Sequence, residues 1–176
     1  MSIKPTIAIF ASDKGPGDSE RSAIMSHAGS FLAAKGVNFI CLAQNGTLCT
    51  PLITSVRSAG AKIKIIADDE FILPKKLNDI ELERYGDEQN RYLRIGELSN
   101  AFIGLPGSLL SIKSLFEAWI ATNRNLPVLL LNKNKNFEFM RGFTMDIISH
   151  KVKNPEKYIS HADNIEDLYN RLQKLI

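Results

Sequence analysis

The segment Ala101–Trp119 has the residue pattern of a strand, then a turn, then a helix. In α/β proteins such a unit often binds phosphate. Its first five residues are apolar, Pro106 and Gly107 predict a tight turn, and apolar side chains then recur at helical spacing. An anion at the start of such a helix gains unpaired N–H groups and the helix dipole. Pro106 and Gly107 are therefore candidate phosphate-binding residues. Ser108 and Ser111 add hydroxyl groups, and Ser111 is also a candidate for the helix N-cap.

The loop after the first apolar run is a second candidate site. Ser12 and Asp13 begin this loop, and glycines follow at positions 15 and 17. Because glycine allows close approach of the backbone, Ser12 and Asp13 are candidate nucleotide-binding residues. An ordinary flexible turn has the same composition, and the residues favour neither interpretation.

Two further groups of polar residues follow apolar or helical segments. Gly46 and Thr47 are candidate ligand-binding residues in a turn where Gln44 and Asn45 add side-chain donors, although a plain strand–helix turn favours the same residue types. Arg91 and Arg94 are three residues apart and place two positive charges on one helix face. Pairs of this kind are most often exposed to solvent.

The hydrophobic pattern supplies the elements that bring these candidates together. Near-continuous apolar runs alternate with amphipathic helical patterns, which predicts a parallel sheet covered on both faces. Ligands of such sheets lie outside the carboxyl ends of the strands. We expect one Rossmann-like, doubly wound α/β domain over residues 1–176. The expected strands are Thr6–Phe10, Val37–Ala43, Lys62–Ala67, Ala101–Leu105 and Val128–Leu131.

Capping and breaking residues mark the ends of the expected helices. Ser19 is a candidate N-cap of the first helix, which ends at Gly36. Residues 68–85 are polar and predict a loop with at most a short strand or turn. A lysine-rich loop is expected to run through Pro155 before the last helix.

The whole chain resembles the LOG family of Rossmann-like cytokinin riboside 5′-monophosphate phosphoribohydrolases. That family has an Arg-Lys pair shortly before the run Asp-Ala-Phe-Ile-Ala-Leu-Pro-Gly-Gly-x-Gly-Thr-x-x-Glu. Here the matching residues are Arg91-Tyr92, Asn100-Ala-Phe-Ile-Gly-Leu-Pro-Gly107 and, further on, Pro127-Val-Leu-Leu-Leu-Asn132. The resemblance implies the fold, a nucleotide ligand, a homodimer, and Arg91 as a residue that acts on the glycosidic bond.

The chain departs from the family motif at the positions that carry the chemistry. Ser108 and Leu110 stand at two glycine positions, and Ser111 keeps a hydroxyl at the threonine position. Leu110 places a side chain where a phosphate oxygen would approach. Ser114 stands at the position of the catalytic Glu, and Tyr92 replaces the Lys. Loss of an acid–base carboxylate typically lowers a rate by about 10²–10⁴.

Two functions therefore remain open. The chain either binds a nucleotide or another phosphorylated small molecule with turnover lost or altered, or it is an active phosphoribohydrolase with a rearranged site. A rearranged site would use Arg91 with Glu117 or Asp13. Glu117 lies three residues after Ser114, and so about 4.5 Å further along a similar helix face.

Composition limits the other classes of partner. A formal net charge of +3 over 176 residues is too small to indicate nucleic-acid binding. No apolar run approaches the roughly 18–20 residues of a membrane span. Cys41 and Cys49 lack metal-site spacing and predict free thiols in a reducing compartment. We expect a cytoplasmic protein without a metal or another cofactor.

Overall fold

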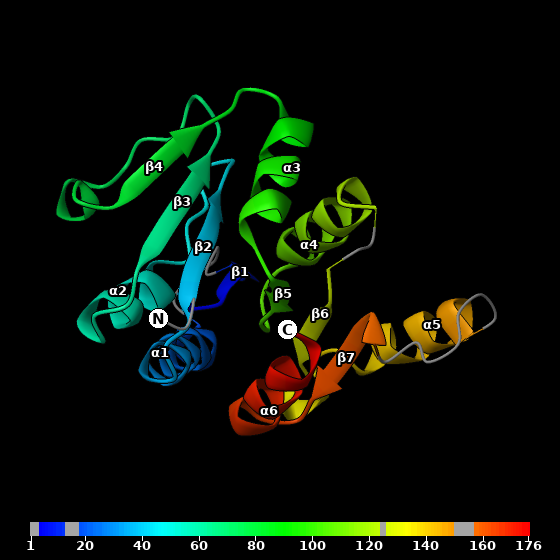
Figure 1. The fold of residues 1–176 in the computed structure, drawn as a ribbon. Coiled ribbons are helices and arrows are strands. Elements are labelled where there is room, and N and C mark those ends of the chain that lie inside the picture. Colours follow the sequence, from blue (N-terminus) through cyan, green and yellow to red (C-terminus); the bar gives the residue numbers. More distant parts are fainter. Residues whose placement is uncertain (1–3, 13–17, 124–125, 150–156) are drawn as a thin grey trace.

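Short apolar runs form the strands of one parallel sheet in the computed structural model, which describes residues 4–12, 18–123, 126–149 and 157–176. The sheet has seven strands in the order β4-β3-β2-β1-β5-β6-β7 (Figure 1). Thr6 of β1 is in register with Asn38 of β2, and Ile7 is in register with Ala101 of β5. The strands are β1 (Thr6–Phe10), β2 (Asn38–Ala43), β3 (Ile63–Ala67), β4 (Glu81–Arg84), β5 (Ala101–Gly104), β6 (Val128–Leu131) and β7 (Ile159–Ala162).

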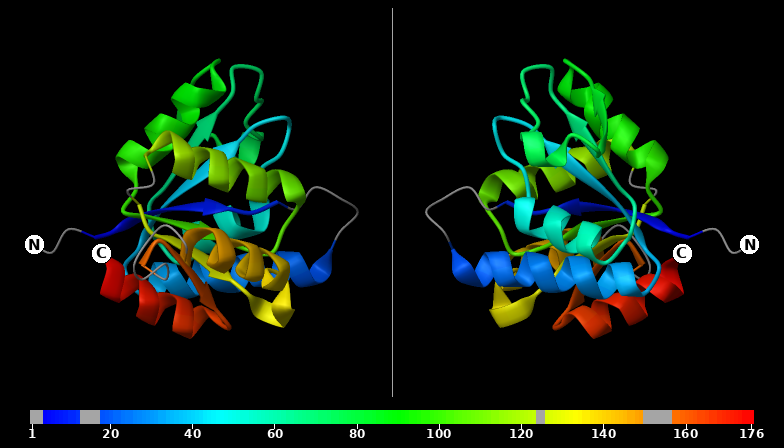
Figure 2. Two further views of the ribbon diagram at one scale, coloured as in Figure 1. Left: turned by 90° about the vertical axis from the view of Figure 1, so that its right-hand side faces the viewer. Right: turned by 90° about the vertical axis from the view of Figure 1, so that its left-hand side faces the viewer.

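Helices cover both faces of the sheet. Figure 2 shows α3 and α4 on one side and α1, α2 and α6 on the other, whereas α5 projects beyond β7 in Figure 1. No helix of the described residues is both long enough and apolar enough to span a membrane. The α-helices are α1 (Ser19–Ala34), α2 (Thr50–Ser58), α3 (Glu88–Leu98), α4 (Leu109–Ala121), α5 (Glu138–Ser149) and α6 (Ile165–Leu175), with 3₁₀ turns η1 (Lys75–Leu77) and η2 (Lys133–Lys135).

Alternating side chains of the central strands build two hydrophobic layers. Ile7 and Ile9 of β1 pack toward α1, α2 and α6, and Ala8 and Phe10 pack toward α3 and α4. Since both faces are covered, each side chain of β1 after Thr6 is buried. This double burial is the physical reason that the apolar runs predicted the five inner strands correctly.

The two edge strands were predicted less well than the inner ones. β4 is the short strand that we allowed for in the otherwise irregular residues 68–85, and β7 was not predicted. The lysine-rich loop expected before the last helix lies at positions 150–155, outside the described residues. β4 pairs only with β3, and its outer side chains reach solvent. Its sequence, Glu-Leu-Glu-Arg, therefore lacks the continuous apolar pattern of the inner strands.

Two predicted helix caps were wrong. Asp18 caps α1, because its side chain accepts hydrogen bonds from the N–H groups of Glu20 (3.1 Å) and Arg21 (3.2 Å), and Ser19 is the first helical residue. Ser108 caps α4 in place of Ser111. Ser108 Oγ accepts from Ser111 N at 3.3 Å, and Ser111 Oγ donates to Ser108 O at 2.8 Å. The cap begins α4 directly after the Pro-Gly turn.

The position of β1 creates the place where a ligand would bind. From β1 the chain adds β2, β3 and β4 on one side and then β5, β6 and β7 on the other. The loop after β1 leads to α1 on one face, and the loop after β5 leads to α4 on the opposite face (Figure 2). Loops that diverge in this way leave a crevice at the carboxyl ends of the strands, which is the usual ligand site of such sheets.

Candidate functional site

A small, partly open pocket lies at the carboxyl ends of β1 and β2, beside the first turn of α4. The described residues that line it are uncharged: apolar side chains are interspersed with hydroxyl groups and one amide. They are Ile9, Phe10, Ala11, Ser12, Leu42, Gln44, Thr47, Ser108, Leu110, Ser111 and Ser114.

Hydrogen-bonding groups at the pocket remain available for a ligand. Thr47 Oγ1 is buried and has no hydrogen-bond partner among the described residues. An unsatisfied buried hydroxyl costs about 1–3 kcal/mol, so a ligand or a water that bonded to it would stabilise the loop. At the start of α4, Ser108 caps the Ser111 N–H, whereas the N–H groups of Leu109 and Leu110 have no acceptor within the helix, and the helix dipole favours an anion beside them.

Gly107 brings the loops after β1 and β5 together. A Cβ atom at this position would lie 3.1 Å from Ser12 N and 2.8 Å from Ser111 Oγ. Gly107 is not among the residues with positive φ, so close packing, and not an unusual backbone conformation, requires glycine here. This part of the motif therefore shapes the pocket.

Gln44 connects the pocket to a buried arginine. Arg91 Nε donates to Gln44 Oε1 at 3.2 Å, and the Gln44 Nε2 group donates to Ser114 Oγ at 3.1 Å. The bond from Arg91 thus orients the amide, with its oxygen toward the cation and its nitrogen toward the hydroxyl that lines the pocket. Arg91 Nη1 donates to the carbonyl oxygens of Tyr85 (2.6 Å) and Gly86 (3.0 Å).

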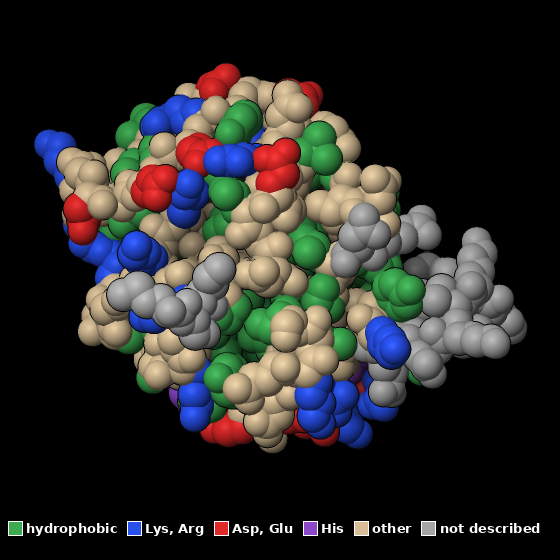
Figure 3. Space-filling model, viewed as in Figure 1, with side chains coloured by type: hydrophobic (Ala, Val, Ile, Leu, Met, Phe, Trp, Pro, Cys, Tyr) green, Lys and Arg blue, Asp and Glu red, His purple; other side chains and the backbone are tan. Residues whose placement is uncertain are grey.

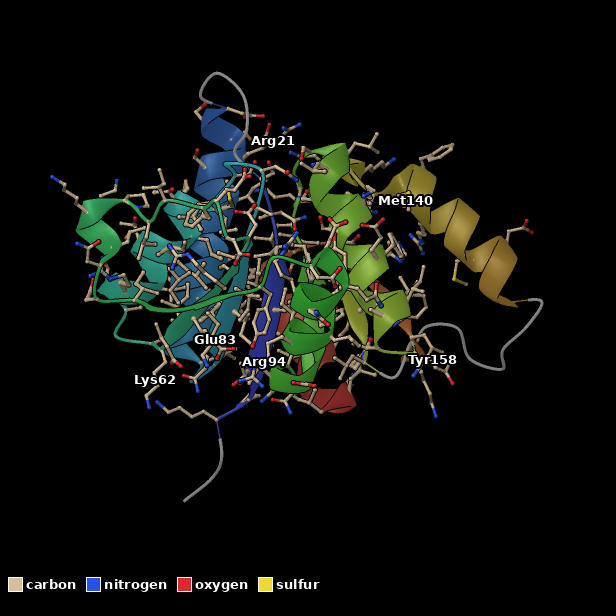
Figure 4. All side chains as sticks on the ribbon, turned by 90° about the horizontal axis from the view of Figure 1, so that it is seen from above. Arg21, Lys62, Glu83, Arg94, Met140 and Tyr158 are labelled. Atoms are coloured by element: carbon tan, nitrogen blue, oxygen red, sulfur yellow. The ribbon has the colours of Figure 1, made fainter. Side chains whose placement is uncertain are left out.

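Arg91 and Arg94 have different environments, although they share a helix. Arg94 forms ion pairs with Glu83 of β4 at 2.7 Å and with Glu97 at 3.1 Å, and Figure 4 shows Glu83 and Arg94 side by side. Arg91 is only 6% exposed, so the expectation of a solvated pair was wrong for this residue. Within the described part of the chain, Arg91 forms no ion pair with a carboxylate, which is unusual for a buried arginine.

Tyr92 occupies the centre of the polar cluster behind the pocket. Its hydroxyl lies 2.9 Å from Glu88 Oε1, 2.9 Å from Glu117 Oε2 and 3.4 Å from Ser114 Oγ. Burial raises the pKa of Tyr92 to about 12, and hydrogen bonds with Glu88 and Glu117 act in the same direction. At the position where the resemblance placed a lysine, the structure therefore holds a neutral phenol.

Glu117 is engaged by two neighbours on its own side of the sheet. Its Oε1 atom is 3.0 Å from Lys113 Nζ, and its Oε2 atom accepts from the hydroxyl of Tyr92. Glu117 does not line the pocket, but Tyr92 links it to Ser114, which does. No group of three or more His, Cys, Asp or Glu side chains within the described ranges could hold a metal ion.

The structure brings some of the candidate residues together and separates others. Ser12, Thr47, Ser108 and Ser111 line the pocket, and Gly107 lies between two of them. Arg91 and Glu117 lie behind it, joined to it through Gln44 and Tyr92. Three candidates lie elsewhere: Gly46 lines a separate open groove with Asp68, Pro106 is buried in the turn, and Asp13 is outside the described residues.

Sequence reasoning did not assign a role to Gln44, Tyr92, Ser114 or Glu88. Gln44 was noted as a side chain with donor groups, and Tyr92 and Ser114 only as replacements. The replacements occur together, and this joint change was the available signal. In the alignment that the resemblance implies, a phenol and a hydroxyl stand where the family has a lysine and a carboxylate, and such side chains form neutral hydrogen bonds in place of an ion pair.

Sheet order and pocket together define the class of protein, a Rossmann-like α/β protein with its candidate site at the topological switch point. No family model and no curated protein matches the chain. Solved structures do match it over nearly their whole length. A molybdenum cofactor carrier protein from Chlamydomonas reinhardtii has a TM-score of 0.73 at 12% identity, with 98% of each chain covered.

Two other solved structures give the same result. The structural genomics target TM1055 has a TM-score of 0.71 at 18% identity, over 98% of this chain and 99% of its own. The molybdenum cofactor binding protein from the phototrophic bacterium Rippkaea orientalis has a TM-score of 0.64 at 16% identity, over 99% of each chain. At these identities the likeness shows a shared fold.

Proposed function

We propose that this chain binds a nucleotide or another phosphorylated small molecule in the pocket beside α4 and does not cleave it. The observation that carries the proposal is Arg91, a buried cation without a carboxylate partner in the described part of the chain, held behind the pocket by Gln44. A buried charge is costly unless an opposite charge balances it. A phosphate at the first turn of α4 would supply that negative charge.

The same cluster supports the loss of turnover. Hydrolysis of an N-glycosidic bond needs a group that activates water or stabilises the developing charge, and Ser114 offers only a hydroxyl where the family has a carboxylate. Glu117 is the nearest substitute, but Lys113 and Tyr92 already engage its two oxygens. The expected loss is about 10²–10⁴ in rate.

One observation favours active phosphoribohydrolysis as a second candidate function. The Tyr92 hydroxyl contacts both Glu117 and Ser114, so one side chain separates the Glu117 carboxylate from the pocket lining. A rotation of Glu117 away from Lys113 would bring a carboxylate to the ligand. Arg91 would then act on the leaving base.

Incubation with AMP separates the two candidates. We expect AMP to raise the melting temperature of the protein while chromatography detects no free adenine. Release of adenine that disappears in Arg91→Ala would overturn the binding proposal in favour of the hydrolase. Neither release nor a thermal shift would overturn both for this nucleotide.

The role of Arg91 can be tested against a charge-matched control. Arg91→Gln removes the positive charge behind the pocket and the hydrogen bond that orients Gln44, so AMP binding should weaken by roughly tenfold in calorimetry. Arg94→Gln is the control. It removes the same charge from the same helix, but Arg94 is paired with Glu83 and Glu97. It should leave AMP affinity nearly unchanged, and equal losses in both variants would contradict a specific role for Arg91.

The structural neighbours add one ligand to the test. Because two of them carry or bind the molybdenum cofactor, we include this cofactor among the candidate small molecules. Retention of molybdenum by the protein after gel filtration, measured by mass spectrometry of the element, would support it.

We also propose that the chain acts in the cytoplasm, where Cys41 and Cys49 are kept as thiols.

We further propose that two copies of the chain pair through the outer face of α4. Leu109 is 86% exposed and Ile120 is 58% exposed, and Ile112 and Phe116 lie between them on the same face. Hydrophobic side chains reach the surface over α4 in Figure 3. Trp119 lies in the core, and its indole N–H donates to Leu126 O at 2.9 Å.

Light scattering after gel filtration tests this pairing. We expect a dimer for the unmodified chain and a monomer for Ile120→Glu. The matched control is Ile72→Glu. Ile72 lies in the loop after β3 and is 86% exposed, so this variant also adds a charge at an exposed position, but away from α4. A monomer for the unmodified chain would contradict the proposal.

A further inference from the structure

Cys41 and Cys49 form a pair of buried thiols that the proposed binding function does not use. Their Sγ atoms are 3.2 Å apart, and the two residues are 0% and 2% exposed. A disulfide bond is about 2.05 Å long, so the two sulfur atoms need to approach by only about 1 Å to form one. The fold therefore holds the two sulfur atoms near each other.

The two cysteines differ in their freedom to move. Cys41 is in the middle of the sheet, in register with Ile9 of β1 and Ile65 of β3. Cys49 is the N-cap residue of α2 and lies at the end of the loop that follows β2. Approach of the two sulfur atoms therefore moves Cys49 and the loop, while Cys41 stays in place.

The loop that would move belongs to the pocket. It contains Gln44 and Thr47, which both line the pocket, and Thr47 N donates to Gln44 O at 3.0 Å across the turn. Gln44 also accepts the hydrogen bond from Arg91. A change at Cys49 is therefore transmitted through a short, hydrogen-bonded turn to the pocket wall.

We propose that Cys41 and Cys49 are an oxidation site, at which a hydroperoxide joins the two thiols in a disulfide that fixes the loop between β2 and α2. The Cys49 thiolate attacks the peroxide, the O–O bond breaks, and Cys49 becomes a sulfenic acid while the peroxide leaves as water or an alcohol. The Cys41 sulfur then attacks Cys49, the S–S bond forms, and water leaves. Two electrons pass from the thiols to the peroxide.

The surroundings set the order and the rate of these steps. Cys49 reacts first because it lies at the end of the loop between β2 and α2, whereas Cys41 is held in the middle of the sheet. The hydrogen bond with Cys49, together with burial, holds the pKa of the Cys41 thiol well above its usual range, so Cys41 stays a thiol until the second step. Burial of both residues makes the reaction depend on opening of the loop, so it is slow.

Mass spectrometry after peroxide treatment tests the site. The folded protein is treated with hydrogen peroxide, the reaction is quenched, and the protein is denatured and alkylated. We expect the main product to lack both alkyl groups, to be lighter by two hydrogen atoms than the reduced chain, and to yield a peptide cross-linked between Cys41 and Cys49. Both thiols fully alkylated, or oxidised separately to sulfinic acids, would overturn the proposal.

Single variants separate a disulfide from unrelated oxidation. Cys41→Ala removes the resolving thiol, so Cys49 should stop at a sulfenic acid that a dimedone-type reagent traps. Cys49→Ala removes the first nucleophile, so Cys41 should stay largely reduced. Equal sulfenic acid trapping in both variants would contradict the assigned order.

Two measurements test the link to the loop without any ligand, so their outcome does not depend on the proposed binding function. Oxidation should slow hydrogen exchange at the amides of residues 44–50 in the unmodified chain but not in Cys49→Ala. Closure of this short ring should also raise the melting temperature by about 5 °C. Unchanged exchange in the oxidised protein would show that the disulfide does not fix the loop.

Discussion

At the scale of single residues, a few neutral side chains behind the pocket bond to one another. Gln44 joins Tyr92 and Ser114 to Arg91. The resulting cluster is hydrogen-bonded internally. Arg91 is the exception, because its charge is left without a carboxylate in the described part of the chain.

The alkaline stability of the protein should report the environment of Tyr92. The folded state keeps the Tyr92 proton up to a pKa of about 12, whereas an unfolded phenol loses it near 10. Stability from this difference is fully present below pH 10 and is lost as the pH rises from 10 to about 12. Tyr92→Phe lacks this dependence, so denaturant titrations should show unmodified chain and variant converging across that interval. A constant difference between them would contradict the buried phenol.

Leu110 should control how closely a phosphate approaches α4. Its side chain lines the pocket beside the start of α4, so Leu110→Gly should increase AMP affinity in calorimetry although it costs about 1 kcal/mol of helix stability. The idea fails if Leu110→Gly does not bind AMP more tightly than the unmodified chain.

At the scale of elements, close helix packing and one ion-pair cluster hold the layers in register. Gly29 of α1 faces Ser55 and Leu52 of α2, and a Cβ atom there would lie 2.2 Å from Ser55 Oγ and 3.0 Å from Leu52 O. On the other face, Glu83 of β4 bonds to Lys64 of β3 at 2.6 Å. It also pairs with an arginine of α3, so the edge strand is fastened on two sides.

Substitution of Gly29 should separate α1 from α2. Gly29→Ala forces the backbones of the two helices apart, and overpacking of this kind costs about 1–3 kcal/mol in the free energy of unfolding. Gly142→Ala in α5 is the control, because a Cβ atom at Gly142 meets nothing within 4 Å. That change should be neutral or stabilising by about 1 kcal/mol in urea titrations. Similar effects at the two glycines would show that the contact with α2 is unimportant.

Low pH should weaken the ion pairs that hold the edge strand β4 in place, because it protonates Glu83. Hydrogen bonds from Arg94 and Lys64 lower the pKa of Glu83 to about 2 from its ordinary value of 4.5. Stability from these bonds is present above pH 4.5 and is lost as the pH falls toward 2. The difference in unfolding free energy between the unmodified chain and Glu83→Gln should therefore shrink over that interval. A difference that stayed constant in acid would contradict this role of the ion pairs.

At the scale of the whole molecule, the inner sheet was predictable from the sequence and the polar cluster was not. Strands such as β1 and β6 are buried on both faces, so nearly all of their side chains are apolar and the strand appears as a continuous apolar run in the sequence. β4 is half solvated and its alternating charges conceal it. Gln44, Arg91 and Ser114 are far apart in the chain, and only the register of β1, β2 and β5 brings them together.

The central claim is that the pocket beside α4 binds a phosphorylated small molecule and leaves it intact. Titration of the isotope-labelled protein with AMP by NMR tests both parts in one sample, because protein amides and the ligand are observed together. We expect the largest amide shifts at Gly107–Ser111 and Thr47, with the AMP signals unchanged over days. Growing signals of free adenine, or shifts that avoid these residues, would contradict the account.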